Sequence, residues 1–294
     1  MCGIMGYYCF GEKKPNKDHI TEMFSLLETR GRDASGFAFV EKGHLTVHKS
    51  PIKSSLFVMT KEWKELALPT ILILHTRAAT QGCNKNDANN HPLFNKQGIA
   101  IVHNGIIYND KDIFGMNKRD GEVDSEAILQ VLSIKGKDDM IKRLFDKLYG
   151  SFAFAAINKN KPEELILVKK DNPIDLYYDI KNDILYFCSE RRLMQEALKL
   201  KARSHRGFNL GEENYHFYEL KNNHGLTLNS NGVESYKRYY PHKFCVREPM
   251  YNASDEIMLI ECPFCLYSTT FNMEKLFNKC EYCGSDINEE DLYI

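Results

Sequence analysis

A cysteine stands directly behind Met1, in the opening stretch MCGIMGYY. If Met1 is removed, Cys2 carries both a thiol and a free α-amine. A thiol is a poor nucleophile until it loses its proton, and an α-amine with a reference pKa of about 7.7–8.0 can accept that proton near pH 7. Gly3 and Gly6 let the backbone pass close to a bound molecule. The alternative is that any residue can stand second in an extended N-terminal segment, so the rest of the chain must decide.

Two close cysteine pairs lie near the other end of the chain, Cys262-x2-Cys265 and Cys280-x2-Cys283. Such pairs present four thiolates to one tetrahedral ion, and Gly284 suits the tight turn after the second pair. The spacing therefore predicts a structural zinc site, with iron as the minor alternative and free thiols or disulfides as the interpretation without metal. The surrounding residues are more acidic than basic, which disfavours nucleic acid and favours docking to a protein.

The first 125 residues contain several short polar islands. Taken singly, each has an ordinary interpretation: His103-Asn104-Gly105 could form a β-turn, and Asp124 could cap the helix that follows it. The islands, in order, are Cys2-Gly3-Ile4, Arg30-Gly31-x-Asp33, His75-Thr76-Arg77 with Ala79-Thr80, Asn90-His91-Pro92, His103-Asn104-Gly105-Ile106 and Asp124-Ser125-Glu126.

Together and in this order, the islands resemble the glutaminase domain of class II glutamine amidotransferases, the family that includes glucosamine-6-phosphate synthase and amidophosphoribosyltransferase. The likeness continues through GSFAFAAI and LYFCSE, so it covers roughly residues 2–200. It implies a four-layer α-β-β-α sandwich of two antiparallel sheets, the N-terminal nucleophile hydrolase fold. It also implies hydrolysis of the side-chain amide of L-glutamine through a thioester on Cys2. Ala78 and Gln81 depart from the sugar-phosphate synthases, which carry Trp and His there, so coupling to the acceptor site is in doubt.

The resemblance assigns roles to the charged and amide groups of the site. Attack on the glutamine carbonyl generates an oxyanion, which requires fixed donors. By resemblance these are the Asn104 side chain and the Gly105 backbone N–H. Arg77 is expected to bind the α-carboxylate, which a planar guanidinium can engage bidentately, and Asp124 the α-ammonium.

Further residues of the islands are expected to support that site. Thr80 and His91 would line the glutamine pocket, and Arg30 would hold the N-terminal loop from behind. His75 and His103 each end an apolar strand, where hydrogen-bonded scaffold is a commoner role for histidine than catalysis. The loop RAATQGCNKNDANN is rich in turn formers, and we expect it to be mobile until a ligand or partner orders it.

Short apolar runs between polar segments predict the strands that position these groups. The expected strands are Gly3–Cys9, Gly36–Val40, Ile71–His75, Ile99–His103, Ser151–Ile157, Leu165–Lys169, Asp175–Asp179 and Ile184–Ser189. The stretches YHFYEL and GLTLN are expected to form another antiparallel pair. Helical patterns cover Ile20–Leu27, Ser125–Leu132, Asp139–Leu148 and Arg191–Leu198. The strands follow one another closely and the helices gather in a few places, an order typical of antiparallel sheets packed with helices, an α+β fold.

Composition bounds the remaining possibilities. A net charge of -1 gives no global attraction to nucleic acid or membrane, and no apolar run is long enough to span a bilayer. An odd count of nine cysteines favours a reduced, cytoplasmic compartment over a disulfide framework. No organic cofactor motif is evident.

We expect a glutaminase domain over residues 2–240, a linker over 241–257 and a zinc-ribbon-like domain over 258–294. The residues after the glutaminase are too few for a synthase domain, so ammonia is expected to pass to a separate synthase or nucleobase-modifying partner. Two alternatives stay open: a cysteine N-terminal hydrolase of another amide, and a non-catalytic scaffold or regulatory protein.

Overall fold

The computed structural model describes residues 1–115, 118–136, 139–200, 214–239, 257–262, 268–272, 278–280 and 284–287. The chain divides into two compact units, Met1–Pro241 and His242–Ile294. The predicted linker falls in residues 241–256, outside the described residues, and on Ile257, where the first strand of the second unit begins.

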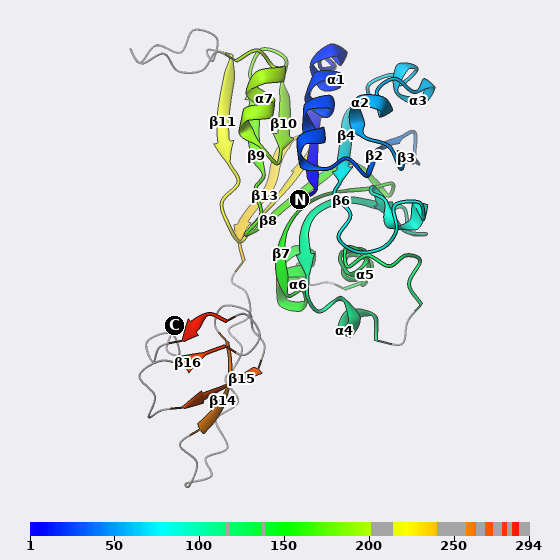
Figure 1. The fold of residues 1–294 in the computed structure, drawn as a ribbon. Coiled ribbons are helices and arrows are strands. Elements are labelled where there is room, and N and C mark those ends of the chain that lie inside the picture. Colours follow the sequence, from blue (N-terminus) through cyan, green and yellow to red (C-terminus); the bar gives the residue numbers. More distant parts are fainter. Residues whose placement is uncertain are drawn as a thin grey trace. The chain divides into compact units, whose positions relative to one another are not determined.

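Two antiparallel sheets build the first unit (Figure 1). The seven-stranded sheet has the order β11 (Tyr215–Glu219), β9 (Asp175–Asp179), β10 (Ile184–Cys188), β1 (Gly3–Cys9), β4 (Ile71–Arg77), β2 (Ala34–Glu41) and β3 (His44–Ser50). The six-stranded sheet has the order β13 (Gly232–Arg238), β12 (His224–Asn229), β8 (Lys161–Lys170), β7 (Gly150–Asn158), β6 (Ile99–Ile107) and β5 (Leu93–Phe94). The expected α+β class with two antiparallel sheets is confirmed.

Helices cover the outer face of each sheet. The helices packed with the seven-stranded sheet are α1 (Lys17–Leu26), α2 (Ser54–Phe57), α3 (Lys61–Lys64) and α7 (Arg191–Ala197), with the 3-10 turn η1 (Leu27–Arg30) after α1. Those packed with the six-stranded sheet are α4 (Asp110–Phe114), α5 (Glu126–Leu132) and α6 (Met140–Lys147). A short 3-10 turn, η2 (Asp87–Asn89), lies in the loop after β4.

Strand alternation explains why the first unit has three apolar cores. Along β1, Met5 and Tyr7 face the core beneath α1, while Ile4 and Tyr8 face the core between the sheets. Successive side chains of a strand point to opposite faces, so a strand covered on both sides reads as a continuous apolar run. All seven residues of β1 are buried, as are those of β4. The layers are therefore helix, sheet, sheet and helix.

The local sequence also sets where the helices begin. Asn16 caps α1 by accepting the Asp18 N–H at 2.8 Å, and Asp139 caps α6 by accepting the N–H groups of Ile141 and Lys142. Asparagine and aspartate oxygens satisfy backbone donors that have no partner within the first turn. Both helices start within three residues of the expected position.

One strand pairing differs from the expectation. The stretches YHFYEL and GLTLN, which form β11 and β12, do not pair with each other. β11 joins β9 at the edge of the seven-stranded sheet, while β12 lies between β8 and β13 in the other sheet. The hairpin partner of β12 is β13, whose charged sequence GVESYKR lacks the apolar run that predicts a strand.

The second unit consists, in its described part, of two short antiparallel pairs. β14 (Ile257–Glu261) pairs with β15 (Ser268–Asn272), and β16 (Asn278–Lys279) pairs with β17 (Asp286–Ile287). Ile260, Phe271 and Ile287 form a small buried cluster with two cysteines, Cys262 and Cys280. Across the described residues of both units, no helix is long and apolar enough to cross a membrane.

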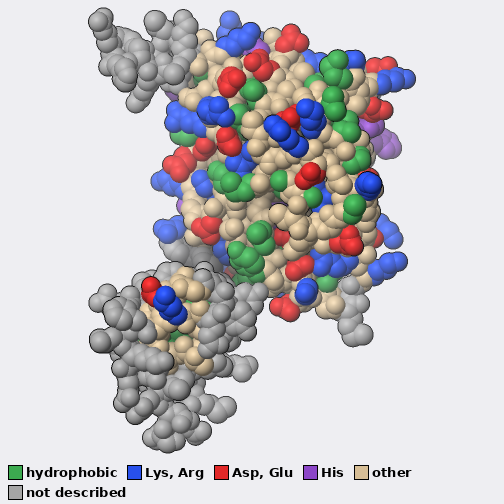
Figure 2. Space-filling view, viewed as in Figure 1, with side chains coloured by type: hydrophobic (Ala, Val, Ile, Leu, Met, Phe, Trp, Pro, Cys, Tyr) green, Lys and Arg blue, Asp and Glu red, His purple; other side chains and the backbone are tan. Residues whose placement is uncertain are grey.

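Basic and acidic side chains are interspersed on the face of the first unit that Figure 2 shows. This distribution agrees with the net charge of -1. A protein that tracks a phosphate backbone needs clustered cations, and this face does not offer them.

Candidate active site

The register of the seven-stranded sheet brings the N-terminus beside the end of β4. Gly3 lies opposite Thr76, and Ala34 of β2 lies opposite Arg77 on the other side of β4. Cys2 is partly buried, with its thiol 3.6 Å from the Ala78 carbonyl oxygen. Burial raises the pKa of the Cys2 thiol, while the positive charge of Arg77 acts in the opposite direction. The thiol therefore needs a nearby base to ionise at neutral pH.

Arg30 contacts the backbone of the N-terminal residues and holds it in place. Its Nε donates to the Cys2 carbonyl at 2.8 Å, and its Nη1 pairs with Glu190 Oε1 at 2.9 Å. Gly31 lies against the backbone of Arg77, since a methyl group there would come within 2.4 Å of the Arg77 carbonyl carbon. The Arg30-Gly31 island thus packs the start of β1 against the end of β4.

Asn104 and Gly105 lie within β6, so the β-turn interpretation of this island is wrong. Asn104 is buried, and its side-chain Nδ2 has no hydrogen-bond partner among the described residues. A buried amide without a partner costs free energy. Gly105 has a φ of 145°, and a methyl group on it would come within 2.1 Å of the Ser151 carbonyl oxygen. The site thus offers an unpaired donor next to a residue that can only be glycine.

The guanidinium of Arg77 is buried beneath the loop that follows β4. Its Nη1 donates to Asn90 Oδ1 at 2.9 Å, and its Nη2 donates to the carbonyl oxygens of Gly82, at 2.9 Å, and Gln81. Burial lowers the pKa of Arg77, although a guanidinium stays protonated in proteins. Asn90 belongs to one of the sequence islands, but no sequence pattern predicts its amide contact to Arg77.

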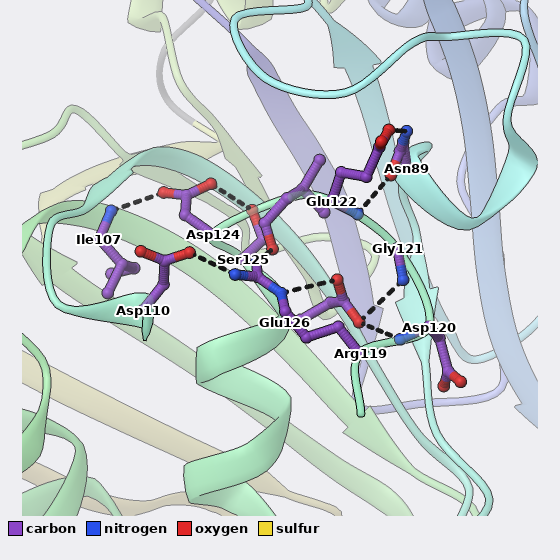
Figure 3. Close-up of polar contacts among 11 residues, drawn as sticks. Asn89, Ile107, Asp110, Arg119, Asp120, Gly121, Glu122, Asp124, Ser125 and Glu126 are labelled. Atoms are coloured by element: carbon purple, nitrogen blue, oxygen red, sulfur yellow. Dashed lines mark hydrogen bonds and ion pairs between the residues drawn. The ribbon is translucent and has the colours of Figure 1, made fainter. Parts of the chain in front are cut away.

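Asp124 lies just before α5 but does not cap that helix. The N-cap residue is Ser125, and the Asp124 carboxylate instead accepts the Ile107 N–H through Oδ2 at 2.6 Å (Figure 3). Its other oxygen, Oδ1, lies 3.5 Å from the Ser125 hydroxyl. Asp124 is close enough to Cys2 for its charge to raise the pKa of the thiol. The carboxylate therefore lies at the same site as Cys2 and Arg77.

Three buried histidines form one cluster beside these groups. His75 stacks on His91 with ring centroids 4.3 Å apart, and its Nε2 contacts the His103 carbonyl oxygen at 2.9 Å. His103 Nδ1 lies 2.7 Å from the Ser125 hydroxyl. Burial lowers the pKa of all three, to about 3 for His75, so they are neutral at pH 7. Their contacts connect the two sheets at the end where Cys2 lies.

Thr80 is exposed in the loop after β4, and its place in the glutamine pocket stays a prediction. His91 is buried and stacks on His75 rather than contacting Arg77. Two residues outside the predicted set, Asn89 and Glu122, bridge the loops that carry Arg77's partners and Asp124. No motif in the sequence singled out this pair.

The predicted metal ligands are only partly described. Cys262 and Cys280 lie together in the buried cluster of the second unit, whereas Cys265 and Cys283 fall outside the described residues. Within the described ranges, no group of three or more histidine, cysteine or carboxylate side chains is arranged to hold a metal.

Comparison with known proteins identifies the class. Residues 75–196 match a family described as "Glutamine amidotransferase domain". Glutamine–fructose-6-phosphate aminotransferase (isomerizing) from Clostridium perfringens (strain 13 / Type A) is 36% identical over 184 residues, covering 59% of this chain and 29% of that protein. The enzyme of the same name from Pyrococcus horikoshii is 36% identical over 186 residues, covering 59% of this chain and 30% of that protein.

A solved structure shares the fold. Glutamine phosphoribosylpyrophosphate amidotransferase from B. subtilis, complexed with ADP and GMP, superposes with a TM-score of 0.59 at 19% identity, covering 81% of this chain and 49% of that one. The chain carries a class II glutamine amidotransferase domain that is homologous to the corresponding part of the aminotransferases, and it shares its fold with the phosphoribosylpyrophosphate amidotransferase. It spans about three tenths of the length of the curated relatives it matches.

Proposed function

We propose that this protein hydrolyses the side-chain amide of L-glutamine through a thioester on Cys2 and delivers the ammonia to an acceptor handled by a separate chain. The observation that carries the proposal is the buried, unpartnered Nδ2 of Asn104, which finds no acceptor among the described residues. Such a donor is stabilised when an oxyanion forms within its reach, because it then gains the hydrogen bond it otherwise lacks.

The chemistry needs a base for a thiol whose pKa burial has raised. Removal of Met1, which is exposed, places an α-amine on Cys2 itself. The neutral amine takes the thiol proton, the thiolate attacks the amide carbon, and the oxyanion is held by Asn104 Nδ2 and the Gly105 N–H. Collapse of the tetrahedral intermediate breaks the carbon–nitrogen bond, and the α-ammonium of Cys2 gives its proton to the departing NH2 group, which leaves as ammonia. Water then adds to the thioester, releasing glutamate and restoring the thiol.

Two opposite charges select the substrate. Arg77 would receive the α-carboxylate, and Asp124 the α-ammonium. Arg77 already donates hydrogen bonds to Asn90, Gln81 and Gly82. Glutamine must therefore share or replace some of these partners. The Arg77 charge lowers the pKa of Cys2 and the Asp124 charge raises it, which supports their proximity to the nucleophile.

We infer that the acceptor is bound by a separate synthase or nucleobase-modifying enzyme. The matching segment covers only 29% of the Clostridium relative, so the likeness supports the glutaminase part alone. The described part of the second unit comprises short strand pairs rather than a sheet with its own large core. A protein-docking role for this unit fits its acidic sequence better than a nucleic-acid contact does.

We also propose that the second unit is a zinc ribbon held by Cys262, Cys265, Cys280 and Cys283. Cys262 directly follows β14 and Cys280 directly follows β16, so both first cysteines occupy the same place in their strand pairs. Both are buried in one cluster. Gly284, which follows the second pair, has a φ of 72°, a conformation that suits the tight turn expected of a zinc knuckle.

The experiment is an assay of glutamate release by the purified protein, with intact-mass analysis of the same sample. Active protein should lack Met1, and Cys2→Ala should abolish both glutamate release and labelling by diazo-oxo-norleucine while the fold persists. Cys83→Ala is the matched control, because Cys83 is an exposed thiol of the loop after β4. Full activity with Met1 retained would overturn the mechanism, and hydrolysis of other amides in preference to glutamine would favour a different amidohydrolase.

A further inference from the structure

The loop that carries the partners of Arg77 and the loop that carries Asp124 meet at one buried amide, that of Asn89. Its Nδ2 donates to Glu122 Oε2 at 2.9 Å and to the Cys83 carbonyl at 3.0 Å. Its Oδ1 accepts the Glu122 N–H at 2.7 Å (Figure 3). Asn89 is fully buried, so this reciprocal pair is protected from water. The side chain therefore ties residues 83–89 to residue 122 by hydrogen bonds in both directions.

Two glycines enclose this amide. Gly82 has a φ of 69°, and a methyl group there would lie 2.5 Å from Asn89 Nδ2. A methyl group on Gly121 would lie 2.8 Å from Asn89 Oδ1. Real Cβ contacts are longer than this, so the loops can approach the amide so closely only because both residues are glycine. The close approach leaves the Asn89 amide little freedom to rotate.

Each side of the pair leads directly to a charged group of the pocket. On one side, the Gly82 carbonyl accepts Arg77 Nη2 at 2.9 Å. On the other, Asp124 follows Glu122 by two residues and is fixed by the Ile107 N–H. A continuous series of contacts thus runs from Arg77 through Asn89 and Glu122 to Asp124.

The loop that carries Glu122 is also held by side chains of α4 and α5. Glu126 Oε2 accepts the N–H groups of Asp120 at 2.9 Å and Gly121 at 3.1 Å. Arg119 lies between two carboxylates, with Nη1 at 2.6 Å from Asp110 and Nε at 3.6 Å from Glu126 (Figure 3). These contacts attach the loop that carries Glu122 to the start of α5. Asn89 attaches the same loop to the loop after β4.

We propose that Asn89 and Glu122 form a latch that sets the separation between Arg77 and Asp124, and so makes the pocket selective for a free α-amino acid. The inference rests on the proposed function, because it assumes that these two residues bind the carboxylate and ammonium of glutamine. Asn89 and Glu122 are positioning residues, since they act through Arg77 and Asp124. The α-carboxylate and α-ammonium of glutamine are held apart by covalent geometry, so both can be bound only when the two protein charges match that separation.

The test compares glutamine with glutaramate, which lacks the ammonium and so does not use Asp124. Kd values for both are measured by calorimetry in a Cys2→Ala background, and kcat and KM are measured with Cys2 intact. Glu122→Ala should raise the Kd and KM for glutamine about 10- to 100-fold, the range expected for a misplaced binding group. The values for glutaramate should change much less. The preference for glutamine over glutaramate should therefore collapse.

Conservative variants separate positioning from general damage. Glu122→Gln keeps the backbone donor and a side-chain acceptor for Asn89, so its preference should stay near that of the wild type. Asn89→Asp places two carboxylates together and should lose the preference. Adding Glu122→Gln to Asn89→Asp should recover part of it, because the new amide can donate to the carboxylate introduced opposite it, although the bond to the Cys83 carbonyl stays lost.

Asn95→Asp is the matched control, because Asn95 also joins two segments through its amide, to Ser133 and Ile99, at the other end of β6. It should leave the preference unchanged. A folded Glu122→Ala variant that loses affinity for glutamine and glutaramate equally, or for neither, overturns the latch. Failure of the proposed function gives a different result: the wild type neither hydrolyses glutamine nor is labelled at Cys2, and the Cys2→Ala protein does not bind glutamine.

Discussion

At the scale of single residues, the candidate site combines a thiol whose ionisation is disfavoured by burial with a hydrogen-bond donor that has no acceptor. Burial raises the pKa of Cys2, and the unpaired Nδ2 of Asn104 has no acceptor among the described residues. Burial favours the neutral thiol, so ionisation needs a base, whereas the unpaired donor costs free energy at rest and, in the proposed mechanism, gains a hydrogen bond when an oxyanion forms. The proposed mechanism therefore predicts that Asn104 stabilises the intermediate more than the free protein.

Asn104→Ala tests this arrangement. We expect kcat to fall by about 10²–10³, the usual loss for one oxyanion donor, with KM for glutamine nearly unchanged. Steady-state kinetics on glutamine provide the measurement. The fold should persist, since the variant removes a buried Nδ2 donor that has no partner to lose within the described part of the chain. A change confined to KM would show that Asn104 contacts the substrate rather than the oxyanion.

The sequence could indicate the candidate site residues but not all of their contacts. Asp124 looked like a helix cap, yet its carboxylate accepts the N–H of Ile107, a residue distant in the chain. Thr80 belongs to a matching island but is exposed in this structure. Asn89 and Glu122 belong to no chemical motif, and only the folded chain brings them together. Such contacts depend on tertiary packing, which one-dimensional spacing does not encode.

At the scale of elements, the loop after β4 is fastened more firmly than its composition suggests. Asp33 Oδ2 accepts the Ala79 N–H at 2.7 Å, and the Asp33 carbonyl accepts Asn84 Nδ2 at 2.9 Å. Polar and turn-forming residues predict mobility, but here they supply the hydrogen bonds that hold the loop over Arg77. The mobility expected for the unliganded loop stays a prediction.

Removing the Asp33 carboxylate should loosen this loop. Asp33→Ala deletes the acceptor for the Ala79 N–H, a bond to a charged group that contributes about 1.5–3 kcal/mol. We expect KM for glutamine to rise by at least tenfold, with faster proteolytic cleavage within residues 78–90. Kinetics combined with limited proteolysis measure both effects. Asp146→Ala is the control, since Asp146 pairs with Lys142 on the exposed side of α6. An unchanged KM and cleavage rate would show that other contacts suffice.

The strands themselves were largely predictable. β1 and β9 have the expected bounds, because apolar runs between polar segments mark strands covered on both faces. The pairing of β11 and β12 was wrong because adjacency in sequence favours a hairpin, whereas these strands lie in different sheets. β3 and β13 were missed because their exposed edges carry many polar residues. Edge strands give a weak signal of this kind.

At the scale of the whole molecule, the buried histidines make stability depend on pH. Burial lowers the pKa of His75 to about 3 and also lowers those of His91 and His103, whereas in the unfolded chain each is about 6.5. Below pH 6.5 the unfolded chain takes up protons that the folded chain does not, so the stability that neutral histidines contribute is lost as the pH falls. Each imidazole can remove about 1.4 kcal/mol per pH unit.

Denaturant unfolding between pH 7.5 and 5 tests this dependence. The free energy of unfolding should be level above pH 7 and fall progressively below pH 6.5. His91→Phe should reduce the slope of the unfolding free energy against pH by about 1.4 kcal/mol per pH unit, the contribution of one proton. The variant keeps a ring to stack on His75 and breaks no hydrogen bond, because both ring nitrogens of His91 have no partner among the described residues. A stability that stays level down to pH 5 would mean that these imidazoles titrate normally in the folded protein.

The second unit, in its described part, has too small a core to be stable on its own apolar contacts. Its buried cluster contains Ile260, Phe271 and Ile287 together with Cys262 and Cys280. Domains of this size usually need a metal or disulfides, and a structural zinc supplies folding free energy directly. We therefore predict one zinc per chain, and its loss should make residues 258–294 sensitive to protease.

Metal analysis of the purified protein and of a Cys280→Ser, Cys283→Ser double variant decides this prediction. The wild type should contain one equivalent of zinc and the variant close to none, while Cys83→Ser, which changes an exposed thiol of the first unit, should keep the metal. Glutaminase activity should survive in both variants, because every residue assigned to the glutamine site lies between Cys2 and Asp124. Iron in place of zinc would show that the four cysteines hold the alternative metal, and a metal-free wild type that resists protease would show that they have another role.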